Sequence, residues 1–167
     1  MEWLSWIVEG VETLVFKQRY VPRYFFLHST PMRLIEQNPF RMLGIVVNAG
    51  ARNLAANKGK MKLLEIGKEV VFPLDLQSIF PPVNRTKESV ENAERDINLP
   101  QDKVRNALFW FANPTDNIGK VAYDHLLQGN TEKSLELFGK STAWESKLCF
   151  ATLHLQAGHY KEALAAI

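Results

Sequence analysis

An internal repeat in the last third of the chain constrains its fold more than any other feature. Five residues recur after 29 positions: Ala122, His125, Leu126, Gly129 and Leu135 return as Ala151, His154, Leu155, Gly158 and Leu164. Two further positions match in kind, Ser134 with Ala163 and Phe138 with Ile167. Small alanines let two helices approach each other, and a glycine ends the first helix. Each unit is therefore predicted to be a helix–turn–helix hairpin in a stacked array.

The second unit reaches only Ile167, inside its predicted second helix. Stacked arrays need about three units and a polar capping unit to be stable. We therefore expect the sequence to be the N-terminal part of a longer protein. The alternative is a naturally short chain that pairs with a partner.

Prolines and helical periodicity predict a separate helical segment before the repeat. Asn38-Pro39 opens it and Asn113-Pro114 closes it. A first helix is predicted over 49–66, with Ala56, Leu63 and Ile66 on its apolar side. A second is predicted over 87–98, and a third from Pro100, with an apolar stripe that ends at Phe111. Residues 69–76 show no helical period, which favours an extended connection with an exposed loop at 72–75.

The distribution of charge points to the first of these helices. The chain has 20 Lys and Arg against 18 Asp and Glu, a formal net charge of +2, which argues against a generally basic nucleic-acid binder. Residues 38–80 alone carry six basic and three acidic side chains, a local +3. The candidate partner-binding residues are five of those basic side chains and three residues of the loop after them: Arg52, Lys58, Lys60, Lys62, Lys68, Phe72, Pro73 and Asp75.

Composition and targeting signals indicate a cytoplasmic protein. Cys149 is the single cysteine, so no disulfide within the chain can form. Glu2 and Glu9 interrupt any secretory signal, and no apolar run is long enough to span a membrane. Residues 14–27 interleave aromatic side chains with two arginines. We interpret them as packing residues, with a membrane surface or a nucleic-acid strand as the alternative.

No motif indicates an enzyme, a cofactor or a metal site. Gly139-Lys140-Ser141-Thr142 resembles the end of a phosphate-binding loop, but Ser134 stands where that motif needs its first glycine. His154 and His159 are five residues apart, which suits a shared helical face poorly. Cys149 lies between Leu148 and Phe150, an apolar setting that favours a buried, inert thiol. We predict no catalytic residues, no cofactor and no metal.

The repeat resembles the tetratricopeptide (TPR) family. Ala122 and Ser134 match its small residues near the eighth and twentieth positions, and Phe138 matches its aromatic residue near the twenty-fourth. A histidine replaces the aromatic residue near the eleventh. The period of 29 differs from the family's roughly 34, and the leading Trp-Leu-Gly pattern is absent. The resemblance, over about the last 45 residues, implies a stacked helical array that binds peptides or proteins.

The middle segment resembles a degenerate J-domain. Its opening, Asn38-Pro39-Phe40-Arg41-Met42-Leu43-Gly44-Ile45, is similar to the short first helix of that family, and a basic second helix follows. The stretch 99–111 looks like the end of the third helix and the element after it. The family's His-Pro-Asp tripeptide, which stimulates its seventy-kilodalton chaperone ATPase, is missing, and Phe72-Pro73-Leu74-Asp75 takes its place. The combination also resembles a group of bacterial proteins that join such a J-like segment to helical repeats.

These observations predict a mainly α protein, with a J-domain-like three-helix segment followed by TPR-like hairpins. The expected organisation is an aromatic segment at 1–37, a J-like domain at 38–113 and the start of a repeat array at 117–167. The predicted function is a non-catalytic interaction module, a scaffold or co-chaperone-like adaptor whose partner is a chaperone or an acidic protein surface. The alternative is nucleic-acid binding through the basic helix 52–68, which the charge makes the weaker interpretation.

Overall fold

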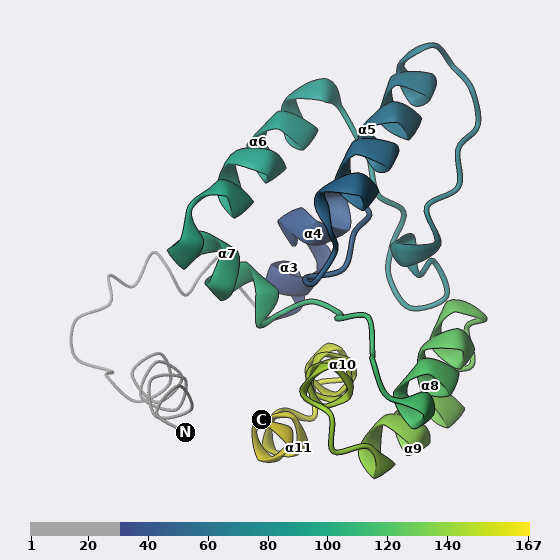
Figure 1. Cartoon of the computed structure of the whole chain (residues 1–167), viewed down its shortest axis with the longest axis vertical. Coiled ribbons are helices and arrows are strands. Elements are labelled where there is room, and N and C mark those ends of the chain that lie inside the picture. Colours follow the sequence, from purple (N-terminus) through teal and green to yellow (C-terminus); the bar gives the residue numbers. More distant parts are fainter. Residues whose placement is uncertain (1–30) are drawn as a thin grey trace. The chain divides into compact units, whose positions relative to one another are not determined.

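The computed structural model describes residues 31–167, where helices alternate with loops and turns and no β-strand occurs (Figure 1). The predicted mainly α fold is thereby confirmed. Both predicted regions, 38–113 and 117–167, lie within one compact unit, residues 31–167. Residues 1–30, and with them the interpretation of 14–27, lie outside the described residues.

The first half of this unit contains short and long helices joined by one long loop. The elements are α3 (Pro31–Glu36), α4 (Pro39–Met42), α5 (Ala51–Glu65), a 3-10 turn η1 (Pro73–Asp75), α6 (Lys87–Asn98) and α7 (Pro100–Ala107). α6 has the predicted bounds, and Pro100 opens α7 as predicted. The predicted third helix is too long, because the chain leaves the helix after Ala107 and runs beside 45–48, where Val47 N–H donates to Phe111 O at 3.0 Å.

The buried face of α5 differs from the predicted one. Leu54, Met61 and Leu64 pack against the core, whereas Leu63 and Ile66 remain 40% and 67% exposed. A polar residue explains the difference: the Asn57 side chain sits on the buried side and donates to the carbonyls of Leu43 and Gly44. Because apolar residues occur on both sides of this helix, periodicity alone cannot identify the inner face.

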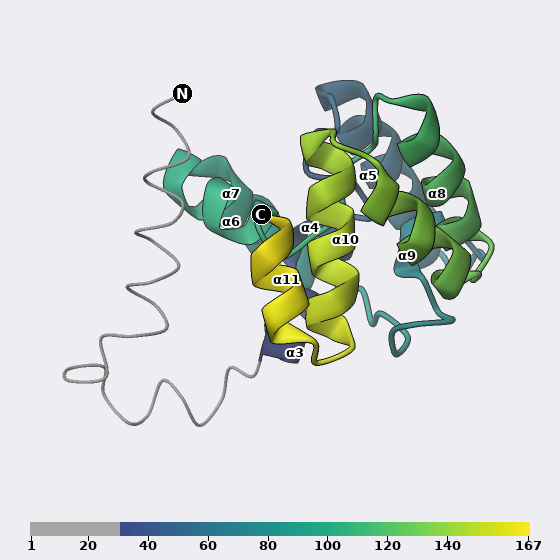
Figure 2. The ribbon, with the colours of Figure 1, turned by 90° about the horizontal axis from the view of Figure 1, so that it is seen from below.

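The second half consists of two helical hairpins in a row. They are α8 (Asn117–Leu127) with α9 (Thr131–Lys140), and α10 (Trp144–Gln156) with α11 (Tyr160–Ala166). Figure 2 shows the four helices side by side in chain order. The row is therefore an ordered stack in which each helix packs on the next.

The turns of the two hairpins are built alike, 29 residues apart. Gly129 and Gly158 end the first helix of each hairpin with φ of +81° and +79°, a left-handed conformation that favours glycine. The next residue closes each turn in the same way: Asn130 N–H donates to His125 O at 2.9 Å, and His159 N–H donates to His154 O at 2.8 Å. The sequence repeat is therefore a repeat of backbone geometry.

The segment 109–115 leaves α7 through a turn, continues without regular secondary structure and fastens the hairpins to the first half. It runs antiparallel to α10: Thr152 Oγ1 donates to Trp110 O at 3.5 Å, and the Cys149 thiol donates to Ala112 O at 3.2 Å. Further along, Thr115 Oγ1 donates to Glu145 Oε1 at 3.1 Å. The Trp110 indole N–H donates in the other direction, to Ile45 O at 2.9 Å. The inner side of α10 is therefore occupied by the chain itself, and a single core joins the two halves.

One buried hydroxyl gives a prediction about the hairpin core. Ser134 is fully buried, its Oγ has no hydrogen-bond partner, and the equivalent residue of the second hairpin is Ala163. Removing an unsatisfied buried hydroxyl relieves its desolvation cost, and alanine is the better helix former. Ser134→Ala should therefore raise the free energy of unfolding by up to about 1 kcal/mol in urea titrations.

Ser146→Ala is the matched control for this change. Ser146 is also fully buried, but its hydroxyl donates to Asp116 Oδ1 at 3.0 Å. The control variant should lose about 1 kcal/mol of stability. Equal losses in the two variants would show that the Ser134 hydroxyl has a partner after all.

Candidate functional site

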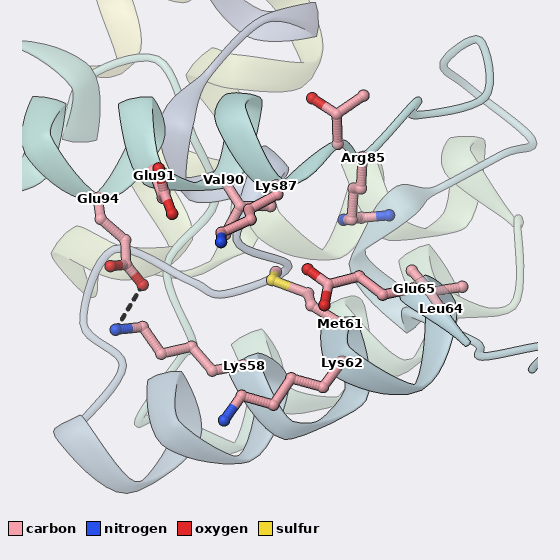
Figure 3. Close-up of a pocket in the computed structure, with 11 residues that line it drawn as sticks. Lys58, Met61, Lys62, Leu64, Glu65, Arg85, Lys87, Val90, Glu91 and Glu94 are labelled. Atoms are coloured by element: carbon pink, nitrogen blue, oxygen red, sulfur yellow. Dashed lines mark ion pairs between the residues drawn. The ribbon is translucent and has the colours of Figure 1, made fainter. Parts of the chain in front are cut away.

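A groove lies between α6 and α5, the helix in the segment with the excess of basic residues. Its volume is about 310 Å³, and side chains from both helices line it (Figure 3). Met61 and Leu64 from α5 and Val90 from α6 supply apolar surface. The charged lining residues are Lys58, Lys62, Glu65, Arg85, Lys87, Glu91 and Glu94.

The charges around the groove are mixed in sign. Lys58 Nζ lies 2.6 Å from Glu94 Oε1 and forms an ion pair across the groove. Lys62 and Lys87 form no ion pair with any residue in 31–167. A mixed lining with an apolar floor suits amphipathic protein side chains better than a uniformly charged ligand.

Four of the five predicted basic residues are exposed, but they do not form one cluster. Lys58 and Lys62 both border the groove. Lys60 is half-buried, with its ammonium 5.7 Å from the centre of the Phe72 ring. Arg52 lies in the first turn of α5, and Lys68 lies beyond its last turn. Of these five residues, only Lys58 and Lys62 therefore border the groove.

The loop at 72–75 is not the exposed loop that the sequence predicts. Phe72 and Asp75 are buried, and only Pro73 of the predicted contact residues in the loop is exposed. The Asp75 carboxylate accepts hydrogen bonds from both terminal nitrogens of Arg85, one of them at 2.8 Å. The Arg85 guanidinium lies 4.0 Å from the centre of the Phe72 ring. This ion pair holds the loop against the molecule.

A second buried arginine, Arg41, also fastens this loop. Arg41, 2% exposed, donates to the backbone oxygens of Glu36, Asp75 and Pro81 at 3.0, 3.1 and 2.6 Å. Burial lowers the pKa of its guanidinium below the ordinary value for arginine, and the nearby Asp75 carboxylate partly offsets that effect. Arg41 and Arg85 thus link the α4 region to the loop.

Sequence reasoning missed the structural roles of Arg41, Arg85 and Asn38. Asn38 caps α4 through its Oδ1, and its Nδ2 donates to Asn106 O at 2.8 Å and to Phe109 O at 3.2 Å. The Asn-Pro opening is a signal for the cap. No signal connects Asn38 to residues about 70 positions away, because those partners meet only in the folded chain.

The remaining candidates for chemistry have structural roles. Burial raises the pKa of the Cys149 thiol to about 12, so it is protonated at neutral pH and a poor nucleophile. His154 and His159 bring their Nδ1 atoms to 3.4 Å, and burial followed by the charge of His159 lowers the pKa of His154. Lys140, in the predicted loop-like motif, pairs with Glu136 at 2.5 Å at the end of α9. Within residues 31–167 no group of three potential metal ligands comes together.

Asp116 is a titratable residue whose role is structural. Its side chain caps α8, accepting from Gly119 N–H at 2.9 Å and from the hydroxyls of Ser141 and Ser146 at 3.0 Å each. The Gly119 hydrogen bond, with those of the two serines, lowers the pKa of Asp116 against the opposing effect of burial. Asp116 therefore joins the start of α8 to the next hairpin.

No protein-family model, no curated protein and no solved structure matches the chain. Among the described residues, no helix has the length and apolar character needed to cross a bilayer.

Proposed function

We propose that this chain is a non-catalytic protein-interaction module, a scaffold or co-chaperone-like adaptor, that binds an acidic partner through one side of α5. We call that side the outer face of α5. It follows the helical spacing of three and four residues, and all its members are exposed: Arg52, Ala55, Ala56, Gly59, Lys62, Leu63 and Ile66.

The observation that carries this proposal is the composition of the outer face. Leu63 and Ile66 expose 40% and 67% of their surface although the opposite side of α5 already supplies the packing of this helix. Lys62 and Arg52 flank these apolar and small residues. Apolar anchors with basic neighbours match a partner that presents apolar side chains among carboxylates.

Gly59 supports a partner that approaches α5 closely. A glycine in the middle of a helix costs about 1 kcal/mol relative to alanine. Nothing lies within 4 Å of the position that a Cβ of Gly59 would occupy, so packing within residues 31–167 does not require the glycine. A closely apposed partner would account for it.

The resemblance to J-domains supports the co-chaperone-like form of the proposal. The family's contact loop corresponds to 72–75, but here Phe72 and Asp75 face inward. Partner contact is therefore assigned to α5 rather than to this loop. Residues 109–115 cover the inner side of α10, an observation that supports binding on outer surfaces.

Nucleic-acid binding through 52–68 is the second candidate. It draws support from the exposed Arg52, Lys62 and Lys68, but Lys58 is paired with Glu94, and Glu65 and Glu91 lie beside the basic groups in the groove. Carboxylates so placed repel a phosphate backbone.

A double variant that reverses one charge and replaces one exposed apolar residue tests the proposal. Lys62→Glu/Ile66→Asp changes the outer face without touching the buried residues of α5, so the fold should be unchanged by circular dichroism. In quantitative affinity capture from host lysate, acidic partners retained by the wild type should fall at least about tenfold with this variant. Lys133→Glu, an exposed charge reversal on α9, is the control and should retain them.

Two outcomes contradict the proposal. Identical partner lists for the wild type and the outer-face variant would show that α5 does not select partners. A mobility shift of single-stranded or duplex DNA or RNA at low salt, lost steeply as salt rises, would favour the nucleic-acid candidate instead.

A further inference from the structure

The turn of the second hairpin brings two histidine side chains together. A spacing of five residues suits a shared helical face poorly, but His154 and His159 do not lie on one helix. α10 ends at Gln156, and Gly158 reverses the chain with φ of +79°. The Nδ1 atoms of the two rings are 3.4 Å apart, whereas the ring centroids are 5.6 Å apart, so these two nitrogens face each other.

The distance between the two nitrogens matches that of two ligands on one metal ion. Imidazole nitrogens bind tetrahedral Zn²⁺ at 2.0–2.1 Å, which separates two such nitrogens by about 3.4 Å. Hydrogen bonds from N–H groups are usually shorter, about 2.7–3.2 Å. The pair of His154 and His159 is therefore spaced for a shared cation better than for a direct hydrogen bond.

The surroundings of His154 hold its ring in place and favour a cation. His154 is 9% exposed, and its ring packs edge-on against Phe150 at a centroid distance of 4.3 Å. Burial and the charge of His159 lower the pKa of His154, whereas the Glu162 carboxylate raises it. A negative charge therefore acts on the ring from the first turn of α11. One ligand is preorganised by packing, and the local charge suits a positive ion.

The first hairpin shows that the turn itself does not require a second histidine. Asn130 is the equivalent of His159, and its side chain caps α9 by accepting from Lys133 N–H at 3.2 Å. His159 begins α11 without a side-chain cap hydrogen bond. Asparagine is among the favoured N-cap residues and histidine is not. The second hairpin thus lacks a cap that the first one has, and the pairing of His159 with His154 accounts for the exchange.

We propose that His154 and His159 bind one divalent transition-metal ion of the Zn²⁺ type through their Nδ1 atoms. Imidazole is a ligand that Zn²⁺, Cu²⁺ and Ni²⁺ accept, whereas Mg²⁺ and Ca²⁺ prefer oxygen. Water completes the coordination, since no group of three ligating side chains gathers within residues 31–167. The bound ion ties the end of α10 to the start of α11. This site does not involve α5 and is independent of the function proposed above.

Titration of the full chain with ZnCl2 near neutral pH, followed by calorimetry, tests the proposal. The wild type should bind one Zn²⁺ per chain at this site. His159→Asn, which introduces the residue of the first hairpin, should weaken that binding at least about tenfold. His125→Asn is the matched control, because it removes the histidine equivalent to His154 from the first hairpin and leaves the pair intact. The control should bind Zn²⁺ like the wild type.

Thermal unfolding gives a second measurement that separates metal binding from folding. Because asparagine is the better cap, His159→Asn should be folded by circular dichroism and at least as heat-resistant as the wild type without metal. Zn²⁺ should raise the Tm of the wild type and of His125→Asn, but not that of His159→Asn. MgCl2 should leave all three Tm values unchanged.

Three outcomes would overturn the proposal. The first is a wild type that takes up no Zn²⁺ at free concentrations up to about 1 mM. The second is equal Zn²⁺ affinity in the wild type and His159→Asn, which would assign the ion to other residues. The third is displacement of Zn²⁺ by an equal concentration of Mg²⁺, which would indicate a site made of carboxylates.

Discussion

Asp75→Ala should lower the free energy of unfolding by about 3–5 kcal/mol. The side chains of Asp75 and Arg85 are only 11% and 5% exposed, and the carboxylate binds the guanidinium through both of its oxygens. Removing the carboxylate leaves the Arg85 charge buried without its counter-ion, which is more costly than losing the attraction alone. Urea unfolding followed by circular dichroism measures the change.

A double-mutant cycle separates the pair from its surroundings. Asp75→Ala/Arg85→Met removes both charges and should be less destabilised than the sum of the single variants. Glu136→Ala is the contrasting case: Lys133 and Lys140 lower the pKa of Glu136 to about 2, yet the three side chains are half-exposed and water screens them. Removing the Glu136 carboxylate should therefore change the free energy of unfolding little. Additive effects in the Asp75–Arg85 cycle would show that the two charges do not act as a pair.

Trp110→Ala should lower the free energy of unfolding by about 3–5 kcal/mol. Trp110 is fully buried, and its ring packs edge-on against Phe111 at a centroid distance of 5.1 Å and tilted against Phe80 at 6.0 Å. The variant also leaves Ile45 O without the indole N–H at 2.9 Å. A large cavity would open where the two halves of the unit meet.

Trp144→Ala provides a control of the same residue type. Trp144 is 59% exposed at the start of α10, so its removal should alter stability by less than about 1 kcal/mol. Circular dichroism is the suitable probe because both variants lose a fluorophore. Similar losses for the two tryptophans would contradict the assignment of Trp110 to the shared core.

The elements that could be predicted from the sequence are those defined by local signals. Val90, Ala93 and Ile97 mark the inner side of α6, and the helix has the predicted bounds. The glycines of the repeat predict both hairpin turns, because their left-handed φ is a requirement of a single residue. Such signals depend on neighbours a few positions away, which the sequence displays directly.

The errors occur where distant residues decide the structure. α5 carries apolar residues on two sides, and its inner side is set by Asn57 binding carbonyls near Leu43. The loop at 72–75 turns inward because Arg41 and Arg85 bind it from positions 34 and 10 residues away. For the candidate site, the basic character of α5 was predictable, but the pairing of Lys58 with Glu94 across the groove was not.

The segment that joins the two halves also determines how a bound partner is presented. Residues 109–115 hydrogen-bond to α10 and pack into the same core as Ile45, so the segment is fastened to both halves. A protein bound to α5 would therefore keep one orientation relative to the row of hairpins.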